Sequence, residues 1–381
     1  RGVRTLRTPR GVHMTGRPET ARALVLTAPR QIGFRDLEVP RPETDCALLR
    51  VEACGLCGTD HEMYTGHLPA AVPLVPGHET VGVIEEVGQA AAARWQVGVG
   101  DRVAIECFQS CRRCQPCRTG AYRRCEKNGL GTAYGLSPLD TPPSLSGGWA
   151  EYHWLGPDTM LVPVPEELEP IDATLFNPVG AGIRWGAELP ATGPGEVVAV
   201  LGPGIRGLAS AAAAREAGAA FVMMTGKGAG DHPRLETAAD FGVDLVVDVD
   251  DQDPVQALRS AAGIRGADVV VDVTANAPSA LGQAVDLAAV GGRIVLAGTR
   301  NSAETPGFRP DVVIYKELRL IGALGVDTTA YRQALDLVAR DQYPFRSVTR
   351  RVASLDEAGD LLSTMAGESD GAPPVHAVLV P

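Results

Sequence analysis

Between residues 195 and 325, short apolar runs alternate with helical segments, and this alternation restricts the fold more than any other feature of the sequence. The apolar runs are "GEVVAVLG", "AFVMMTG", "VDLVVDV", "ADVVVDVT", "GGRIVLAG" and "ELRLIGALG". Stretches such as "IRGLASAAAAREAG" and "APSALGQAVDLAA" read as helices between them. Strands that are apolar along their whole length are buried on both faces. The sequence therefore predicts an α/β region with a doubly wound parallel sheet.

A glycine-rich segment directly follows the first apolar run. It reads Gly202-Pro-Gly204-Ile205-Arg-Gly207 and joins a predicted strand to an alanine-rich predicted helix. In this context the glycines let the backbone approach a pyrophosphate, which then lies at the helix N-terminus. We therefore expect Gly202, Gly204, Ile205 and Gly207 to bind a dinucleotide.

The end of the second predicted strand indicates which dinucleotide is bound. A carboxylate about 20 residues beyond the glycine segment would hold the ribose 2′-hydroxyl, but this chain has Thr225, Gly226 and Lys227 there. Without that carboxylate a 2′-phosphate is not repelled, and Lys227 offers a positive charge, with His232 and Arg234 as alternatives. The expected cofactor is NADP, with NAD or dual use as the alternative. An exposed Lys227 without a role fits the pattern equally well.

Half of the eight cysteines occur in one short polar segment, and they are Cys111, Cys114, Cys117 and Cys125. Thiolates separated by two, two and seven residues can surround one tetrahedral zinc ion. Structural disulfides are disfavoured in a reducing cytoplasm, and four buried apolar cysteines do not suit a segment rich in arginine and glutamine. The segment is predicted to be a structural zinc lobe.

A second group of candidate metal ligands lies upstream, in a region of short predicted strands. Residues 22–105 carry apolar alternation interrupted by glycine and proline, which predicts an all-β region. Within it, "CGTD" begins at Cys57, and "PGHE" supplies His78 and Glu79. A thiolate, an imidazole and a carboxylate are all good zinc donors. We expect Cys57, His78 and Glu79 to bind a second zinc ion.

Composition argues against several classes of function. The net charge of −11 disfavours nucleic acid and anionic membranes as partners, since both require a basic surface. The sequence has no run of eighteen apolar residues and no signal-peptide pattern, so a soluble, cytoplasmic protein is expected. Residues 1–19 are expected to be a disordered extension, with Met14 as a candidate start.

Taken together, the motifs resemble the zinc-dependent medium-chain dehydrogenase/reductase family, which includes alcohol, polyol and sugar dehydrogenases. The resemblance begins near residue 20 and rests on "GLCGTD", "VPGHETVGVIEEVG", "GDRVAI", the zinc lobe, "GGWAEY", "VLGPGIRGLA" and "GGRIVLAG". It implies a GroES-like β-barrel catalytic domain, expected at 20–185 and 326–381. It also implies an inserted Rossmann domain, expected at 186–325, with the active site in the cleft between the two.

The resemblance further implies roles for single residues. Cys57 and His78 would be ligands of a catalytic zinc ion, and the four cysteines of the lobe would hold a structural one. Asp60 would hydrogen-bond to His78 and fix the orientation of its ring. Thr59 would pass the proton of a substrate hydroxyl toward solvent.

Two positions depart from the family pattern. Relatives usually have Cys, Asp or Glu as the third zinc ligand, whereas this chain has Asn177, whose neutral amide oxygen is a poorer ligand. Our hypothesis is that Glu79 completes the zinc site and that Asn177 hydrogen-bonds the bound water or substrate. Direct ligation by Asn177 and weak metal affinity are the alternatives. Relatives often have a proton-relay histidine where this chain has Glu62, one residue after His61.

The resulting prediction is a zinc-dependent, NAD(P)-linked oxidoreductase. It would interconvert a small-molecule alcohol (a polyol, sugar or secondary alcohol) and its carbonyl compound by hydride transfer. The alternatives are a zinc-independent NADPH enoyl or quinone reductase of the same fold, a formaldehyde-type dismutating dehydrogenase, and a non-catalytic dinucleotide-binding redox sensor. A homodimer or homotetramer is expected by analogy, with the apolar run at 318–325 as the pairing edge.

Overall fold

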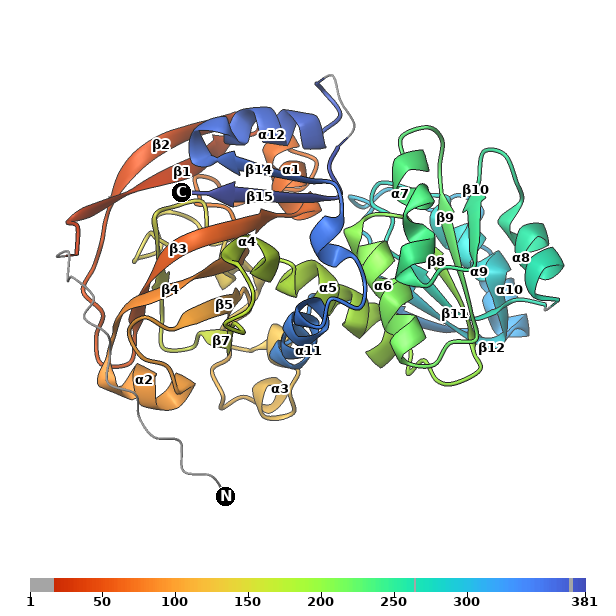
Figure 1. Ribbon diagram of the computed structural model, residues 1–381, viewed down its shortest axis with the longest axis horizontal. Coiled ribbons are helices and arrows are strands. Elements are labelled where there is room, and N and C mark those ends of the chain that lie inside the picture. Colours follow the sequence, from red (N-terminus) through yellow and green to blue (C-terminus); the bar gives the residue numbers. More distant parts are fainter. Residues whose placement is uncertain (1–16, 264, 370–372) are drawn as a thin grey trace.

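The computed structural model describes residues 17–263, 265–369 and 373–381. It has a β-rich half and an α/β half, with helices at the junction between them (Figure 1). The disordered extension predicted at 1–19 lies outside the described residues, apart from 17–19. Within the described ranges, none of the helices has both the length and the apolar character needed to cross a membrane.

The six apolar runs form one parallel sheet in the α/β half, as the sequence predicts. The strand order is β10-β9-β8-β11-β12-β13, and the chain direction across the sheet reverses beside β8, as in doubly wound dinucleotide-binding folds. The strands are β8 (Val197–Leu201), β9 (Phe221–Gly226), β10 (Leu245–Asp248), β11 (Ala267–Asp272), β12 (Ala288–Leu296) and β13 (Arg319–Gly322).

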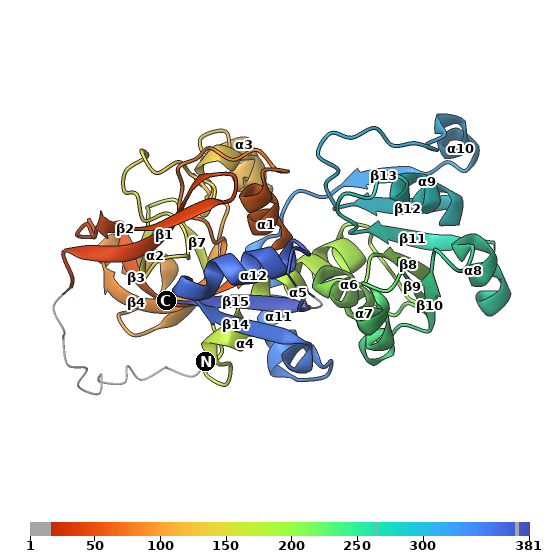
Figure 2. The ribbon, with the colours of Figure 1, turned by 90° about the horizontal axis from the view of Figure 1, so that it is seen from above.

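Helices cover both faces of this sheet (Figure 2). On one face, Val198 of β8 belongs to the same apolar cluster as Leu208 of α6. On the other face, Ala199 of β8 clusters with Leu258 of α8 and Val285 of α9. Because neighbouring residues of a strand point to opposite faces, an all-apolar strand supplies both clusters. The helices are α6 (Ile205–Glu216), α7 (His232–Glu236), α8 (Pro254–Ala262), α9 (Ala280–Leu287) and α10 (Pro310–Tyr315).

The β-rich half is built on a seven-stranded sheet of order β14-β15-β3-β4-β5-β7, with β6 paired to β3. Its strands are β3 (Ala47–Leu56), β4 (Glu79–Val87), β5 (Arg102–Glu106), β6 (Tyr152–Leu155), β7 (Met160–Pro163), β14 (Arg350–Ser354) and β15 (His376–Val380). Its short helices are α1 (Gly58–Thr65), α2 (Gln89–Trp95), α3 (Gln115–Arg118) and α4 (Pro170–Ala173).

The C-terminal segment returns to this sheet after the α/β half. Strand β15 pairs antiparallel with β3, and β14 pairs with β15. Helix α12 (Ala358–Met365) packs over a two-stranded ribbon of β1 (Thr20–Ala28) and β2 (Gln31–Glu38). The β-rich half therefore combines residues from both ends of the chain, as Figure 1 shows by its red and blue elements.

The junction between the halves is a close contact of three helices. Helix α5 (Phe176–Ile183) continues as a π-helical turn at Arg184–Glu188, and it packs against α6 and α11 (Thr328–Ala339). A Cβ added at Gly182 would lie 2.4 Å from atoms of Ala209, and one at Gly186 would lie 2.4 Å from the Ser210 carbonyl oxygen. These glycines thus allow the helices to approach closely. One apolar core continues from the β-rich half through α5 and α11 into the α/β half.

His153 of β6 is a titratable residue inside the β-rich core. Its side chain is 0% exposed and packs edge-on against Tyr134, with 4.6 Å between the ring centroids. Among the described residues, neither ring nitrogen has a hydrogen-bond partner. Burial lowers the pKa of His153 from its ordinary value of 6.5 to about 3. Below pH 6.5 the unfolded chain therefore binds a proton that the folded chain does not. The free energy of unfolding consequently decreases as the pH is lowered.

Replacing His153 by phenylalanine is expected to flatten this acid dependence. Between pH 7.5 and 5.0, His153 should cost the wild-type protein about 2 kcal/mol of unfolding free energy, at about 1.4 kcal/mol per pH unit. Urea unfolding at both pH values measures the difference. His376, whose pKa burial also lowers to about 3, remains as the same background in both proteins. An identical loss in wild type and His153→Phe would contradict the prediction.

Candidate active site

The "CGTD" motif places Cys57 at the N-terminus of α1. Cys57 is the residue that caps the helix, and its Sγ accepts a hydrogen bond from the Thr59 backbone N–H at 3.3 Å. The Asp60 carboxylate accepts in return from the Cys57 backbone N–H at 2.9 Å. This reciprocal pair is a capping box, which a cysteine in place of the usual serine or threonine completes. Four consecutive residues therefore determine the local position of the Cys57 sulfur.

His78 and Glu79 lie at the start of β4, beside this helix cap. The Asp60 Oδ1 is 3.5 Å from His78 Nδ1 and accepts a hydrogen bond from the Gly77 backbone N–H at 3.4 Å. Asp60 therefore lies next to His78, but the hydrogen bond expected between them is not formed. The two atoms are at ion-pair distance. Within the described residues His78 Nδ1 has no hydrogen-bond partner of adequate geometry.

Cys57, His78 and Glu79 are all buried, and their donor atoms lie within 4.8 Å of one another. Zinc bonds of about 2.0–2.3 Å in tetrahedral geometry separate donor atoms by about 3.3–3.8 Å, so a small movement would bring all three onto one ion. One thiolate, one imidazole and one carboxylate leave a fourth position open, which is typical of catalytic zinc sites. The residues present therefore fit a zinc ion.

An arginine that the sequence interpretation did not assign contacts this group. Arg206 belongs to the first turn of α6, and its Nη2 donates to Glu79 Oε1 at 2.9 Å and to Asn177 Oδ1 at 3.0 Å. The Asn177 Nδ2 donates to the Tyr331 hydroxyl at 2.9 Å. Both polar ends of Asn177 are therefore engaged. In the sequence, the one feature that set Arg206 apart was its charge inside a glycine-rich segment that is otherwise uncharged.

Arg206 also changes the electrostatics of the site. Burial would raise the pKa of the Cys57 thiol, but the Arg206 guanidinium and His78 outweigh burial and lower it. For Glu79 burial dominates and raises the pKa of the carboxyl, although Arg206 and His78 oppose this. Positive charge beside Cys57 favours the thiolate, which is the form that binds metal.

The glycine-rich segment forms the tight turn that its pattern predicts. Gly202 has a φ of +102°, and a Cβ at Gly207 would lie only 1.9 Å from the Gly202 carbonyl oxygen. Gly204 precedes Ile205, the first residue of α6. The backbone N–H groups of this first turn have no earlier turn to bond, so they are available to an anion.

The end of β9 lacks a carboxylate, as its sequence predicts. Thr225 is 3% exposed, and its carbonyl oxygen accepts from the Gly202 backbone N–H at 3.0 Å. The Lys227 side chain is 73% exposed, with its Nζ 3.9 Å from Asp250 Oδ1. On the adjacent strand, the Asp248 carboxylate accepts from the Gly228 backbone N–H at 3.1 Å. The positive charge of Lys227 is therefore in solvent, where it can turn toward a ligand.

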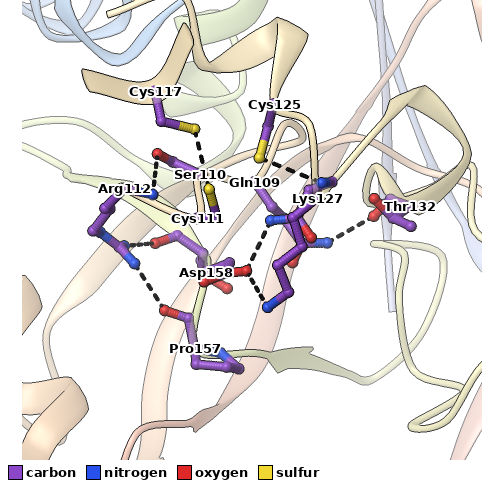
Figure 3. Close-up of polar contacts among 12 residues, drawn as sticks. Gln109, Ser110, Cys111, Arg112, Cys117, Cys125, Lys127, Thr132, Pro157 and Asp158 are labelled. Atoms are coloured by element: carbon purple, nitrogen blue, oxygen red, sulfur yellow. Dashed lines mark hydrogen bonds and ion pairs between the residues drawn. The ribbon is translucent and has the colours of Figure 1, made fainter. Parts of the chain in front are cut away.

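The four cysteines of the predicted lobe converge on one point, partly shown in Figure 3. The Cys111 and Cys117 sulfurs are 3.8 Å apart, and the Cys114 and Cys125 sulfurs are 4.0 Å apart. A disulfide requires about 2.05 Å, whereas tetrahedral zinc with bonds of about 2.3 Å separates sulfurs by about 3.8 Å. The backbone N–H groups of Cys114 and Arg113 hold the pKa of the Cys111 thiol at about 6. The lobe therefore fits a zinc ion.

Polar contacts connect the lobe to its surroundings. Around it, Lys127 Nζ pairs with Asp158 at 2.7 Å, and Arg112 donates to the Pro157 carbonyl oxygen at 2.9 Å (Figure 3). The Tyr122 hydroxyl donates to Glu106 of β5 at 2.7 Å and accepts from the first backbone N–H of α11 at 2.8 Å. The lobe thereby connects the β-rich sheet to a helix of the junction.

Glu62, at the position where relatives carry a relay histidine, points toward the α/β half. Its side chain is buried, and its Oε1 accepts a hydrogen bond from Asn276 Nδ2 at 3.2 Å. Asn276 follows β11 and in turn accepts from Asn301 Nδ2 at 2.7 Å. His61 does not share this contact, and its buried Nδ1 has no partner in the described ranges. Nothing in the sequence indicated Asn276.

Comparisons with known proteins match both halves of this arrangement. The family described as "Alcohol dehydrogenase GroES-like domain" matches residues 43–166, and the family "Zinc-binding dehydrogenase" matches residues 207–340. A Mycobacterium tuberculosis protein named "Probable alcohol dehydrogenase adh" is 60% identical over 361 residues, covering 94% of this chain and 98% of that protein. Sorbitol dehydrogenase of Bacillus subtilis is 31% identical, covering 91% and 93% respectively.

Solved structures agree with these matches. A zinc-binding dehydrogenase from Sinorhizobium meliloti bound to NADP superposes with a TM-score of 0.81 at 29% identity, covering 96% of this chain and all of that one. An alcohol dehydrogenase from Thermus sp. ATN1 superposes with a TM-score of 0.80 at 27% identity, covering 94% and 99%. The fold and these relatives define an oxidoreductase with a GroES-like domain and a Rossmann domain. The chain belongs to the zinc-dependent medium-chain dehydrogenase/reductase family.

Proposed function

We propose that this protein interconverts a small alcohol, in particular a polyol or secondary alcohol, and its carbonyl compound, with one catalytic zinc ion, one structural zinc ion and NADP. The observation that carries the proposal is the buried Cys57–His78–Glu79 group, which Arg206 joins directly to the glycine-rich turn. Relatives named as alcohol dehydrogenase, sorbitol dehydrogenase and D-xylulose reductase support this substrate class. The proposal includes a reducing compartment such as the cytoplasm, which the free cysteines of the described chain support.

The proposal assigns the two halves different tasks. Residues 20–185 and 326–381 form the catalytic domain, and residues 186–325 bind the dinucleotide through Gly202, Gly204, Ile205, Gly207 and Thr225. Zinc, when bound, acts as a Lewis acid that makes a substrate hydroxyl more acidic, and the nicotinamide accepts or donates a hydride.

Four residues around the metal position have separate roles in this proposal. The Thr59 hydroxyl, 3.5 Å from Cys57 Sγ, takes the substrate proton and passes it toward solvent. Asp60 orients the His78 ring. Glu79 is the third ligand. Asn177 holds the arginine that positions Glu79, and a hydrogen bond from its amide to bound water or substrate stays a prediction, since the amide oxygen has a second lone pair and the nitrogen a second N–H.

The alternatives are less well supported. A zinc-independent enoyl or quinone reductase has no use for two preassembled donor groups, each with ligand atoms within 4.8 Å of one another. A non-catalytic redox sensor needs no thiolate, imidazole and carboxylate beside the dinucleotide turn. The zinc-independent reductase and the redox sensor both predict a protein without an alcohol-dependent reduction of NADP.

The deciding experiment is metal analysis of the purified chain, followed by an alcohol and ketone panel. Plasma mass spectrometry should give about two zinc ions per chain. Polyols and secondary alcohols should reduce NADP, and the corresponding ketones should oxidise NADPH. One zinc ion per chain, together with no turnover on the panel, would overturn the proposal.

Replacing Lys227 by alanine should weaken the preference for NADP. An exposed ammonium that contacts a 2′-phosphate contributes about 1 kcal/mol, so the ratio of kcat/KM for NADP to that for NAD should fall about fivefold. Steady-state kinetics with both cofactors measure this ratio. Arg259→Ala removes the same charge from an exposed position of α8 and serves as the control. A ratio that does not change would show that Lys227 is not the 2′-phosphate contact.

We also propose that the protein is a dimer that pairs through the free edge of β13. β13 is the last strand in the order of its sheet, Leu320 of this strand is 40% exposed, and further exposed apolar side chains belong to the segments next to it in the chain or in the sheet, namely Val290, Ile314, Tyr315 and Leu324. Replacing Leu320 by lysine should convert a dimer to a monomer in light scattering, because a charge at a pairing edge opposes association. A mass that is the same for both proteins would contradict this edge as the interface.

A further inference from the structure

Arg206 belongs to the glycine-rich turn at residues 202–207, called the dinucleotide turn below, so its backbone cannot move independently of that turn. It lies between Ile205 and Gly207 in the first turn of α6. The turn is tightly closed, since even a Cβ at Gly207 would collide with the Gly202 carbonyl oxygen at 1.9 Å. A ligand that binds the backbone N–H groups of this turn therefore also restricts the position of the Arg206 Cα atom.

At its other end, Arg206 connects a strand of the β-rich half with a helix of the junction. Its Nη2 bonds to Glu79 of β4 and to Asn177 of α5, at 2.9 and 3.0 Å. Glu79 is 2% exposed and Asn177 is 5% exposed. Without Arg206 the Glu79 carboxylate would lose its ion pair in a buried site, where only His78 and a bound metal could offset its charge, and this loss is costly unless the carboxylate moves or takes up a proton. Arg206 therefore determines the orientation of Glu79.

We propose that Arg206 is a positioning residue that couples the dinucleotide turn to the metal centre, so that dinucleotide and catalytic zinc each raise the affinity for the other. The inference rests on the proposed function, because Glu79 must be a zinc ligand for its orientation to matter to the metal. Binding energies couple reciprocally, so one factor describes both effects. Loss of a residue that orients a metal ligand lowers metal affinity about 10- to 100-fold.

Two effects of Arg206 on zinc oppose each other, and geometry decides between them. The positive guanidinium repels a divalent cation, which alone would lower zinc affinity. The same group holds Glu79 and Asn177 through one nitrogen, which fixes a ligand that would otherwise have several orientations. Since both acceptors are buried and already bonded, we expect the positioning effect to exceed the repulsion.

The test measures zinc affinity with and without NADPH. Zinc at the weaker site is titrated against a fluorescent chelator in wild type, Arg206→Ala, Arg206→Lys and the exposed control Arg259→Ala. In parallel, NADPH is added to protein whose weaker site holds Co²⁺, and the visible spectrum of the metal is recorded. Wild type and the control should bind zinc about fivefold or more tightly with NADPH present, and their Co²⁺ spectra should shift.

In both Arg206 variants the factor by which NADPH raises the zinc affinity should fall to about one. The Co²⁺ spectrum should no longer respond to NADPH. The lysine variant keeps the charge but lacks the planar guanidinium, so it separates geometry from charge and remains available if the alanine variant does not fold. A wild-type factor of one, or an unchanged factor in either Arg206 variant, overturns the inference and leaves the proposed function intact. A wild-type chain that binds zinc at one site only, or does not bind NADPH, overturns both.

Discussion

Replacing Cys57 by alanine is expected to remove one of two zinc ions per chain and to lower kcat/KM for alcohol oxidation at least about a thousandfold. The thiolate is one of three protein donors in the buried group, and two remaining donors hold zinc poorly. A Lewis acid at the reacting oxygen is worth several kcal/mol in the transition state, and each 1.4 kcal/mol is a factor of about ten.

Metal analysis and steady-state kinetics on the same preparation test this expectation. Cys46→Ala is the matched control, because Cys46 is also buried but lies outside both donor groups. The control should keep both zinc ions and its activity. Two zinc ions in Cys57→Ala would show that the catalytic ion does not depend on this sulfur, and the assignment of the active site would then be wrong.

Replacing Cys111 by serine is expected to remove the other zinc ion and to lower the melting temperature by about 5 °C. No residue of α3, the helix of the lobe, is buried, so metal binding is expected to supply much of the folding energy of the lobe. The lobe also holds the Tyr122 hydroxyl between Glu106 and α11, and a disordered lobe would break both bonds. A loss of about 4 kcal/mol corresponds to a shift of about 5 °C, because the unfolding entropy of a chain of 381 residues is about 0.8 kcal/mol per kelvin.

Scanning calorimetry and metal analysis distinguish this variant from Cys57→Ala. Cys111→Ser should keep one zinc ion and retain measurable turnover at low temperature, because the candidate active site is intact. Cys46→Ser is the control for the loss of a buried thiol. If Cys111→Ser melts like wild type while it lacks one zinc ion, the lobe is not a stabilising element.

Those parts of the site that are local in sequence were predictable. The capping box joins Cys57 and Asp60, three positions apart, and the four lobe cysteines lie within residues 111–125. The dinucleotide turn likewise follows from glycine spacing. Neighbouring residues on a short turn have few alternative arrangements, so residue type and spacing decide the geometry. The six strands were predictable because an all-apolar strand alternating with helices has few folds available.

The contacts between distant segments were not predictable. Arg206 meets Glu79 across 127 residues, Asn177 meets Tyr331 across 154, and Asn276 meets Glu62 across 214. In each pair the sequence shows two polar residues but not which pairs become neighbours.

The sequence by itself therefore determined the family, the two groups of candidate metal donors and the glycine-rich turn. Only the tertiary structure decided what surrounds them, above all the placement of an arginine from the dinucleotide turn against the donor group at Glu79. The reason is physical. Periodicity specifies which face of a helix or strand is buried. Which polar groups become neighbours on that face depends on how whole elements pack. This packing joins segments that are far apart along the chain, and the local sequence does not record it.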